Sequence, residues 1–302
     1  MTGIDISEWN GEIDFNKVKK HVDFIMIRAT WGNKHEDTHF RVYADECVKL
    51  GIPFGFYYYS YALNEDEAKK EVLYFLKTIS EYKEKISFPL AIDMEDADGY
   101  KLKNGFPENQ VLCNICQIAC DEIGKAGYYP IIYASLDYFT NKLVCENIAK
   151  YNKWLAWWNS KAEEQVNKDK YQMLQYKSTG IIDGIKTKVD INKSFVEFHK
   201  VIAYVNNIRK IQEVKLRTGL EDITFQYISL YKFGNFLLDK IYARLLNPKK
   251  IKNKEQDIHK VIKEEYMLEK RTIEYLENYI YGEALFLKLY KAICIQEKES
   301  DV

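Results

Sequence analysis

The arrangement of apolar and polar positions changes near residue 200 of the chain. Up to that point, short apolar runs rich in β-branched and aromatic residues alternate with amphipathic stretches of helical period, the clearest at residues 64–79 and 109–127. Strands and helices that alternate at this spacing predict a parallel α/β layer or barrel, and about eight strands in about 195 residues favour a compact barrel over an open sheet. The predicted strands lie at residues 3–7, 22–30, 52–61, 88–95, 129–135, 153–158, 171–176 and 187–192.

Beyond residue 200, apolar positions of helical period predominate. Within residues 220–246 and 256–295 they fall largely on one face, and residues 201–214 precede them as another amphipathic stretch. We therefore expect an α/β domain at residues 1–197 and a small all-α domain at residues 203–302, with about three helices. We identify no internal repeat in the sequence.

Composition narrows the range of partners. The chain has 302 residues with 44 Lys and Arg against 45 Asp and Glu, and this balance does not point to nucleic acid. Neither a signal peptide nor an uncharged apolar stretch of membrane-spanning length is evident, so we expect no membrane partner. The six cysteines are scattered in a chain far larger than a disulfide-stapled miniprotein, and we expect them to be reduced thiols.

The segment PLAIDMEDADGY, residues 89–100, places four acids at the end of a predicted strand. Because residues i and i+2 of a strand share a face, Asp93 and Glu95 emerge side by side, at the strand end that carries chemistry in parallel barrels. Neighbouring carboxylates raise each other's proton affinity, which can keep one protonated as a general acid. We assign Asp96 and Asp98 to a solvated turn.

Metal binding is a weaker interpretation of these residues. Counted as an EF-hand loop from Asp93, the segment has Asp98 where glycine is required. The helical triplet Cys113, Cys116 and Cys120 has no histidine nearby in sequence, and a buried apolar helix face is favoured over a zinc site. We expect no metal and no cofactor.

Two further acids lie in apolar strands at the ends of the α/β region, Asp5 and Asp190. Either one alone is more often a cap or a structural acid. In a closed barrel the first and last strands are neighbours, so both acids are expected at the mouth that holds Asp93 and Glu95.

Seven segments of the first domain resemble, in order, the landmarks of the glycoside hydrolase family 25 lysozymes, the N-acetylmuramidases common among phage endolysins. The resemblance covers residues 2–195 and departs from the family at Trp31, where an acid is frequent, and at Tyr58, where a histidine often stands. The segments are GIDISEWNGEIDF, IMIRATWG, GIPFGFYYYSYA, LAIDMED, GYYPIIYAS, WLAWW and LQY followed by VDIN.

The resemblance implies a flattened TIM-like barrel that hydrolyses the β-1,4 bond between N-acetylmuramic acid and N-acetylglucosamine. It implies that Glu95 is the general acid and then base, and that Asp93 stabilises the 2-acetamido group, the internal nucleophile. Asp5 and Asp190 match an outer pair of acids that hold the charge and geometry of the site. Aromatic residues at or near family positions are candidates for substrate contact, and strand alternation allows a subset of them to face the cleft, with core packing as the alternative for each: Tyr57, Tyr59, Tyr133, Trp157 and Tyr176.

The expected partner is bacterial peptidoglycan, approached from the host cytoplasm after release. By analogy with bipartite endolysins, the helical domain is expected to bind a secondary cell-wall polymer, with homo-oligomerisation as the rival role. Two alternatives to the muramidase remain open, a chitinase-like or N-acetylglucosaminidase activity and a non-catalytic wall-binding protein.

Overall fold

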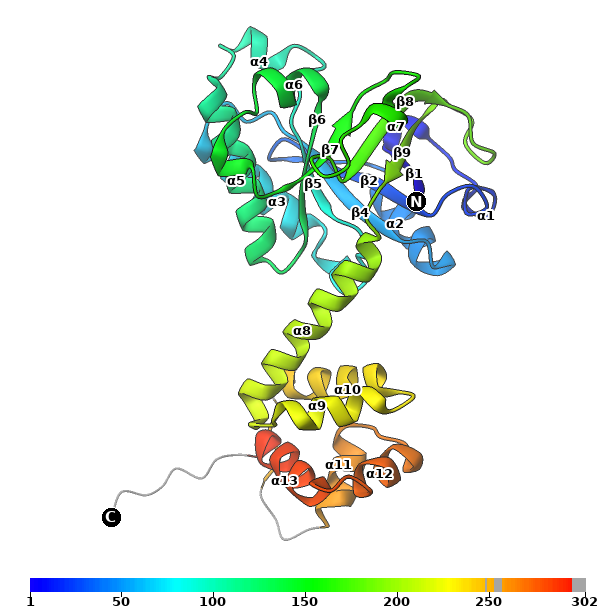
Figure 1. Ribbon diagram of the computed structural model, residues 1–302, viewed down its shortest axis with the longest axis vertical. Coiled ribbons are helices and arrows are strands. Elements are labelled where there is room, and N and C mark those ends of the chain that lie inside the picture. Colours follow the sequence, from blue (N-terminus) through cyan, green and yellow to red (C-terminus); the bar gives the residue numbers. More distant parts are fainter. Residues whose placement is uncertain (248, 253–256, 295–302) are drawn as a thin grey trace, which may run out of the picture. The chain divides into compact units, whose positions relative to one another are not determined.

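The structure is a computed structural model, and it describes residues 1–247, 249–252 and 257–294. The chain divides into two compact units, one up to residue 202 and one from residue 203 onwards. Figure 1 shows a sheet surrounded by helices in the first unit and helices alone in the second.

Eight strands of the first unit close into a barrel, which confirms the predicted fold class. The strands follow one another in the order β1, β9, β8, β7, β6, β5, β4, β2, and a pairing of β1 with β2 completes the ring. A short strand β3 pairs with β2 outside the ring. The strands are β1 Thr2–Ile6, β2 Phe24–Trp31, β3 His35–Glu36, β4 Phe54–Tyr59, β5 Leu90–Asp93, β6 Pro130–Ser135, β7 Asn152–Ala156, β8 Met173–Gly180 and β9 Val189–Ser194.

The last strand differs from the expected parallel arrangement. All pairings from β1 through β2 and β4 to β8 are parallel, whereas β9 runs antiparallel to both β8 and β1. The short connection 181–188 contains no helix, and a strand that returns directly after its neighbour must be antiparallel. As a result, the start of β9 lies at the mouth where the other strands end.

The helices of the first unit pack on the outer faces of the strands. Strand residues that alternate outward form the larger core with these helices, and those that alternate inward, such as Phe24, Met26 and Ile131, fill the barrel. The helical segments are η1 Glu8–Asn10, α1 Phe15–Val18, α2 Phe40–Leu50, α3 Glu65–Thr78, η2 Ser80–Tyr82, α4 Tyr100–Lys103, α5 Asn109–Lys125, α6 Leu136–Asn141, η3 Glu146–Ile148 and α7 Ala162–Gln165.

The cysteines correct one expectation. Cys113 of α5 and Cys145 are joined in a disulfide, with their Cα atoms 6.2 Å apart, so these two are not reduced thiols. The pairing was not visible in the sequence because the residues are 32 positions apart and meet only when the segment before η3 folds beside α5. Cys116 and Cys120 are buried free thiols of the core, which confirms the apolar helix face.

The second unit contains more and shorter helices than the expected three. The stretch 220–246 is broken before Gly234, and the stretch 256–295 is broken twice within its described part. The helices are α8 Phe198–Thr218, of which the first residues belong to the first unit, α9 Asp222–Leu230, α10 Gly234–Leu246, α11 Ile258–Glu265, α12 Lys270–Glu277 and α13 Gly282–Ile293.

The second unit is an internal repeat, contrary to our interpretation of the sequence. Helices α8 to α10 and α11 to α13 follow the same pattern at an offset of 48 residues, the separation of Tyr227 from Tyr275. The turns before α9 and α12 share a left-handed residue, Gly219 with φ +67° and Met267 with φ +50°. Identical residues at this offset include Leu220 and Leu268, Thr224 and Thr272, Tyr231 and Tyr279, Gly234 and Gly282, Lys240 and Lys288, and Tyr242 and Tyr290.

Contacts between the two repeats are reciprocal, as expected for a two-fold relation. The Tyr227 hydroxyl donates to the backbone oxygen of Tyr275 at 2.7 Å, and the Tyr275 hydroxyl donates to that of Tyr227 at 2.7 Å. Two equivalent ring pairs stack, Tyr227 on Tyr279 at 4.3 Å and Tyr231 on Tyr275 at 4.2 Å between centroids. The repeats therefore pack on each other through one shared set of tyrosines.

The lysines of the repeat are reciprocal too. Lys288 donates to the backbone oxygen of Gly219 at 2.7 Å, and Lys240 donates to the equivalent oxygen of Met267. Each turn is thus held by a side chain of the other repeat.

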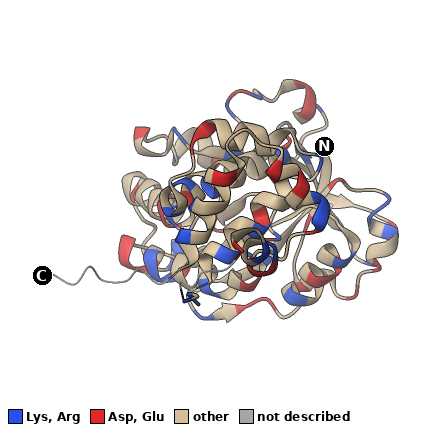
Figure 2. Ribbon diagram, turned by 90° about the horizontal axis from the view of Figure 1, so that it is seen from below, with Lys and Arg blue, Asp and Glu red and all other residues tan. Residues whose placement is uncertain are grey.

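Charged residues are dispersed over the chain. Figure 2 shows Lys and Arg interspersed with Asp and Glu along the helices. None of the described helices has both the length and the apolar character required to cross a membrane.

The close approach of β4 to the next strand gives a stability prediction. A Cβ atom at Gly55 would lie 2.3 Å from the backbone oxygen of Pro89, which cannot move away cheaply. We expect Gly55→Ala to lower the free energy of unfolding by about 1–3 kcal/mol. Urea unfolding followed by tryptophan fluorescence reports the first unit, because all five tryptophans lie there.

The matched control is Gly124→Ala in α5. A Cβ atom at Gly124 meets nothing within 4 Å, so this variant should gain about 0.5–1 kcal/mol from helix propensity. If Gly55→Ala had the same free energy of unfolding as the wild type, the close contact with Pro89 could not be what requires glycine at this position.

Candidate active site

The four predicted acids converge at the mouth of the barrel. Strand alternation turns Asp5, Asp93 and Asp190 inward, and Glu95 follows two residues after Asp93. They line a cavity of about 280 Å³. Its lining consists of Asp5, Arg28, Tyr57, Tyr59, Asp93, Glu95, Ala97, Tyr133, Trp154, Trp158, Gln175, Ser178 and Asp190.

Asp5 and Asp190 form a carboxyl pair across the closure of the barrel. They are direct partners on the antiparallel strands β1 and β9. Burial raises the pKa of Asp5 to about 6, although hydrogen bonds from Asn192 and Gln175 lower this pKa and so oppose the effect of burial. Burial, and then the neighbouring charge of Asp5, raise the pKa of Asp190 to about 8. Near neutral pH the pair therefore keeps a proton between its two carboxyl groups.

Asp93 carries an oxygen that is ready for a ligand. Its side chain is buried, and its Oδ1 atom has no hydrogen-bond partner among the described residues. Burial, and secondly the charge of Glu95, raise the pKa of Asp93 well above its usual range. A buried polar atom without a partner is costly, so this oxygen is suited to accept a hydrogen bond from a bound molecule.

Glu95 has the proton affinity of a general acid that works near neutrality. Burial raises the pKa of Glu95 to about 7, although the nearby Lys101 cation opposes this change. An acid–base group is most effective when its pKa lies near the working pH.

Lys101 is a buried cation that the sequence did not reveal. Its side chain is fully enclosed, and its Nζ donates to the backbone oxygen of Glu95 at 2.8 Å and to that of Ser60. Asp96 accepts hydrogen bonds from the backbone N–H groups of Lys101 and Leu102 at 2.7 and 3.0 Å, which anchors the start of α4. Asp96 therefore positions the lysine and takes no place in the cavity lining.

The predicted aromatic contacts divide into two groups. Tyr57, Tyr59 and Tyr133 line the cavity, whereas Trp157 and Tyr176 pack against the outer core. Trp157 and Tyr176 therefore take the alternative of core packing, because alternation along the chain turns them away from the interior.

Their inward neighbours take these places in the lining. Trp158 and Gln175 line the cavity, and the Gln175 Oε1 atom accepts from Trp158 Nε1 at 2.9 Å and from the Tyr133 hydroxyl at 3.0 Å.

Amides that sequence reasoning missed complete the hydrogen bonds of the acids. Gln175 and Asn192 donate to Asp5 Oδ2 at 2.9 and 2.7 Å. Asn192 also accepts from Trp154 Nε1 at 2.8 Å. Asn192 could have been predicted from the sequence, because it lies two residues after Asp190 and therefore on the same face of β9.

The two departures from the family pattern lie in different surroundings. Trp31 lines a second cavity of about 590 Å³, together with Tyr61, Asp98 and Tyr100. Tyr58 is buried in the outer core and packs on Phe75 of α3, with ring centroids 5.0 Å apart. Only the departure at Trp31 therefore changes the lining of a cavity.

A closed β/α barrel that gathers buried carboxyl groups at its mouth, one of them with a pKa near neutrality, is the kind of site that acid–base glycoside hydrolases use. The model of the Glycosyl hydrolases family 25 matches residues 4–185, more than half of the chain. The chain belongs to this family and is a glycoside hydrolase.

Individual relatives agree with this assignment. The autolytic lysozyme of Clostridium acetobutylicum is 28% identical over 235 residues, which cover 73% of this chain and 67% of that protein. The modular autolysin LytC of Streptococcus pneumoniae superimposes with a TM-score of 0.56 at 28% identity, over 63% of this chain and 46% of LytC. This chain thus matches less than half of LytC.

A third relative shows the fold alone. The bacterial lysozyme of Streptomyces coelicolor superimposes with a TM-score of 0.57 at 21% identity, over 68% of this chain and 97% of that protein.

The raised acid pKa values predict that stability falls as pH rises. The folded state holds protons on Asp5, Glu95 and Asp190 up to about pH 6, 7 and 8, whereas the unfolded chain releases them near pH 4. This contribution to stability is complete below about pH 4 and is lost as pH rises to about 8.

Asp190→Asn tests this relation. The variant removes one ionisation, so its stability should fall less between about pH 5 and pH 8, with a gain at pH 8 on the order of 1 kcal/mol. Urea unfolding at both pH values, followed by tryptophan fluorescence, measures the slope. Equal slopes in the variant and the wild type would refute the shared proton.

Proposed function

We propose that the protein is a muramidase that hydrolyses the β-1,4 bond between N-acetylmuramic acid and N-acetylglucosamine in peptidoglycan. The observation that carries the proposal is the pairing of Glu95, with a pKa near 7, with the buried and unpartnered oxygen of Asp93 in one cavity. Family membership and the lysozyme and autolysin relatives support the same activity.

Glu95 is the proposed general acid and then base. It donates its proton to the glycosidic oxygen that leaves, while the 2-acetamido oxygen of the substrate attacks the anomeric carbon. Water then opens this cyclic intermediate at the anomeric carbon and gives a proton to Glu95, which restores the acid. This internal nucleophile replaces the second carboxylate of the common retaining scheme.

Asp93 is the proposed partner of the acetamido group. Its free Oδ1 atom is suited to accept the acetamido N–H and so to turn the acetamido oxygen toward the anomeric carbon. Asp5 and Asp190 lie in the same cavity, and their shared proton limits the negative charge around Glu95.

We further propose that the helical unit binds the cell wall, by a secondary polymer. The rival role was homo-oligomerisation through the aromatic helix faces. The tyrosines on those faces are largely occupied within the chain, because the tyrosines of one repeat stack on those of the other. This arrangement favours wall binding over oligomerisation. The predicted storage in the cytoplasm of the host bacterium stays a prediction.

Glu95→Gln tests the assignment of the acid. The amide cannot supply the proton, so release of reducing ends from purified walls should fall about 100-fold or more. The matched control is Asp98→Asn, an acid of the same segment that lines a different cavity and should keep most activity. Substantial lysis by Glu95→Gln would overturn the assignment.

The chemical identity of the reducing end tests the bond that is cleaved. Mass analysis should find N-acetylmuramic acid at the new reducing ends. N-acetylglucosamine there would assign the protein to the N-acetylglucosaminidase alternative.

Lys101→Met tests the electrostatic control of Glu95. The Lys101 cation lowers the pKa of Glu95, so its removal should raise this pKa and move the basic limb of the kcat/KM profile to higher pH. Lys103→Met changes an exposed lysine of the same helix and should leave the profile in place. An unchanged basic limb in Lys101→Met would contradict this role.

A further inference from the structure

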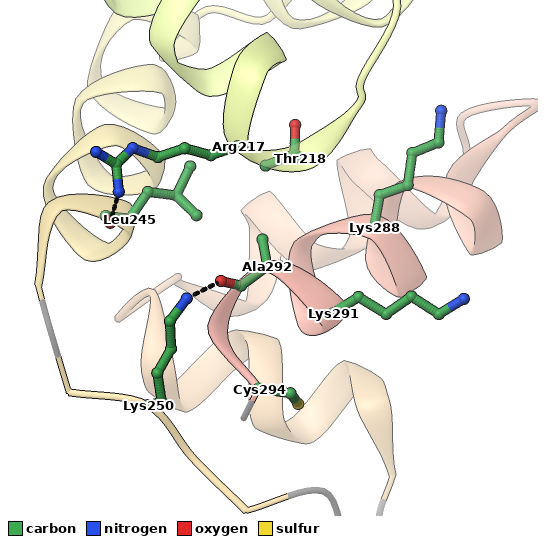
Figure 3. A pocket seen from close by; sticks show the side chains of 8 residues that line it. All are labelled: Arg217, Thr218, Leu245, Lys250, Lys288, Lys291, Ala292 and Cys294. Carbon is green, nitrogen blue, oxygen red and sulfur yellow. Dashed lines mark hydrogen bonds between the residues drawn. The ribbon is translucent and has the colours of Figure 1, made fainter. Parts of the chain in front are cut away.

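One difference between the two repeats of the helical unit is a cavity of about 570 Å³ with basic walls. Figure 3 shows the side chains that line it, from the end of α8, the last turn of α10 and the segment after it, and the last turns of α13 with Cys294 that follows. The residues that matter here are the bases Arg217, Lys250, Lys288 and Lys291 and the small residues Thr218 and Ala292.

The equivalent place in the other repeat is filled. At the offset of 48 residues, Thr218 corresponds to Tyr266 and Ala292 corresponds to Arg244. Tyr266 is almost fully buried, and Arg244 is 8% exposed and forms an ion pair with Glu265 at 2.6 Å. The cavity therefore exists because two small residues stand where the other repeat has two large ones.

The charges differ between the two places as well. Arg217 stands at the position of Glu265, and Lys291 at the position of Ala243. One repeat has an ion pair, Arg244 with Glu265, whose charges neutralise each other. The cavity lacks both members of this pair and instead has two cations, Arg217 and Lys291. At this place the two repeats thus differ both in volume and in positive charge.

The positive charge of the cavity is only partly balanced. Its lining contains no acid among the described residues, although Glu213 pairs with Arg217 and Glu221 lies 3.8 Å from Lys288. Lys291 pairs with none of the acids in the described ranges. Among the residues that the structure describes, four cations therefore face two nearby acids.

Backbone oxygens accept hydrogen bonds from three of these cations, because Lys288 donates to Gly219 at 2.7 Å in addition to the two bonds of Arg217 and Lys250. As Figure 3 shows, Arg217 donates to the backbone oxygen of Leu245 at 3.2 Å, and Lys250 donates to that of Ala292. These bonds cap the ends of α10 and α13 and hold the two bases at the cavity wall. The side chains of Lys288 and Lys291 extend from α13.

We propose that this cavity binds an anionic group of the phosphate type. Arginine and lysine together suit phosphate oxygens, because guanidinium offers several fixed donors and ammonium offers a mobile charge. The volume lies in the range of small-molecule sites and accommodates a phosphodiester with its flanking groups. If the ligand is a wall polymer, this inference rests on the wall-binding role proposed for the helical unit. A soluble phosphate compound would present the same chemistry to the cavity.

The test uses the full chain and two probes. Titration calorimetry with inorganic tripolyphosphate measures the site itself, and sedimentation with purified cell walls measures the wall-bound source. Walls are compared before and after hydrofluoric acid treatment, which removes phosphodiester-linked polymers. Both bindings should weaken as salt is raised.

The decisive variant gives the cavity the residues of the other repeat. Arg217→Glu combined with Ala292→Arg introduces the ion pair that Arg244 and Glu265 form at the equivalent place, so the fold is expected to tolerate both changes. This double variant lowers the net charge by one. Lys270→Ala, at an exposed lysine of α12, lowers it by one as well and is the matched control.

Tripolyphosphate binding should fall at least about tenfold in the double variant, less strongly in Lys291→Ala, and not in Lys270→Ala. Absence of tripolyphosphate binding in the wild type, or equal loss in the Lys270→Ala control, would overturn the site. If the wild type binds tripolyphosphate and also sediments less with walls treated with hydrofluoric acid than with untreated walls, a wall polymer is supported as the source of the anionic group. Tripolyphosphate binding with equal sedimentation on intact and stripped walls supports a soluble phosphate.

The muramidase assignment is tested separately from this site. Glu95→Gln should retain tripolyphosphate binding while it loses hydrolysis, since Glu95 belongs to the barrel and the cavity to the helical unit. Loss of hydrolysis and loss of tripolyphosphate binding are therefore measured separately, so either proposal can fail without the other.

Discussion

The pairing of β1 with β9, the first and last strands of the barrel, is the constraint on which the active site depends. It sets Asp5 directly opposite Asp190 and brings Asn192 of β9 within hydrogen-bond distance of Asp5. Carboxyl groups in such a buried place are costly when charged, and amide donors together with a retained proton reduce that cost. The antiparallel direction of β9 is essential, because it brings the start of this strand to the mouth where the parallel strands end.

A buried cation, Lys101, opposes the effect of burial on the pKa values of both remaining acids. Lys101 contacts the backbone oxygen of Glu95, and its charge acts on both Asp93 and Glu95. Lys101 lies in α4, and Asp96 holds the start of this helix by accepting a hydrogen bond from the backbone N–H of Lys101. The acidic segment after β5 therefore contains residues with separate duties: Asp93 and Glu95 line the cavity, and Asp96 places the lysine that limits their proton affinity.

The sequence was sufficient for features that depend on local pattern. The eight strands and the inward acids follow from apolar runs and strand alternation, and the structure confirms the barrel. Alternation also explains why Tyr176 packs in the outer core, because its neighbour Gln175 is the residue that faces the cavity. Lys101, the Cys113–Cys145 disulfide and the direction of β9 depend on contacts between distant segments, which the pattern of one segment does not contain. The repeat was missed because its identical residues are separated by variable ones and share no strong composition signal.

The reciprocal tyrosine contacts have a consequence for folding. Each repeat supplies the rings, hydroxyl groups and lysine that satisfy its counterpart, so neither is a complete structure alone. Such mutual dependence makes the two halves one cooperative unit, in which local opening of either exposes the apolar face of both.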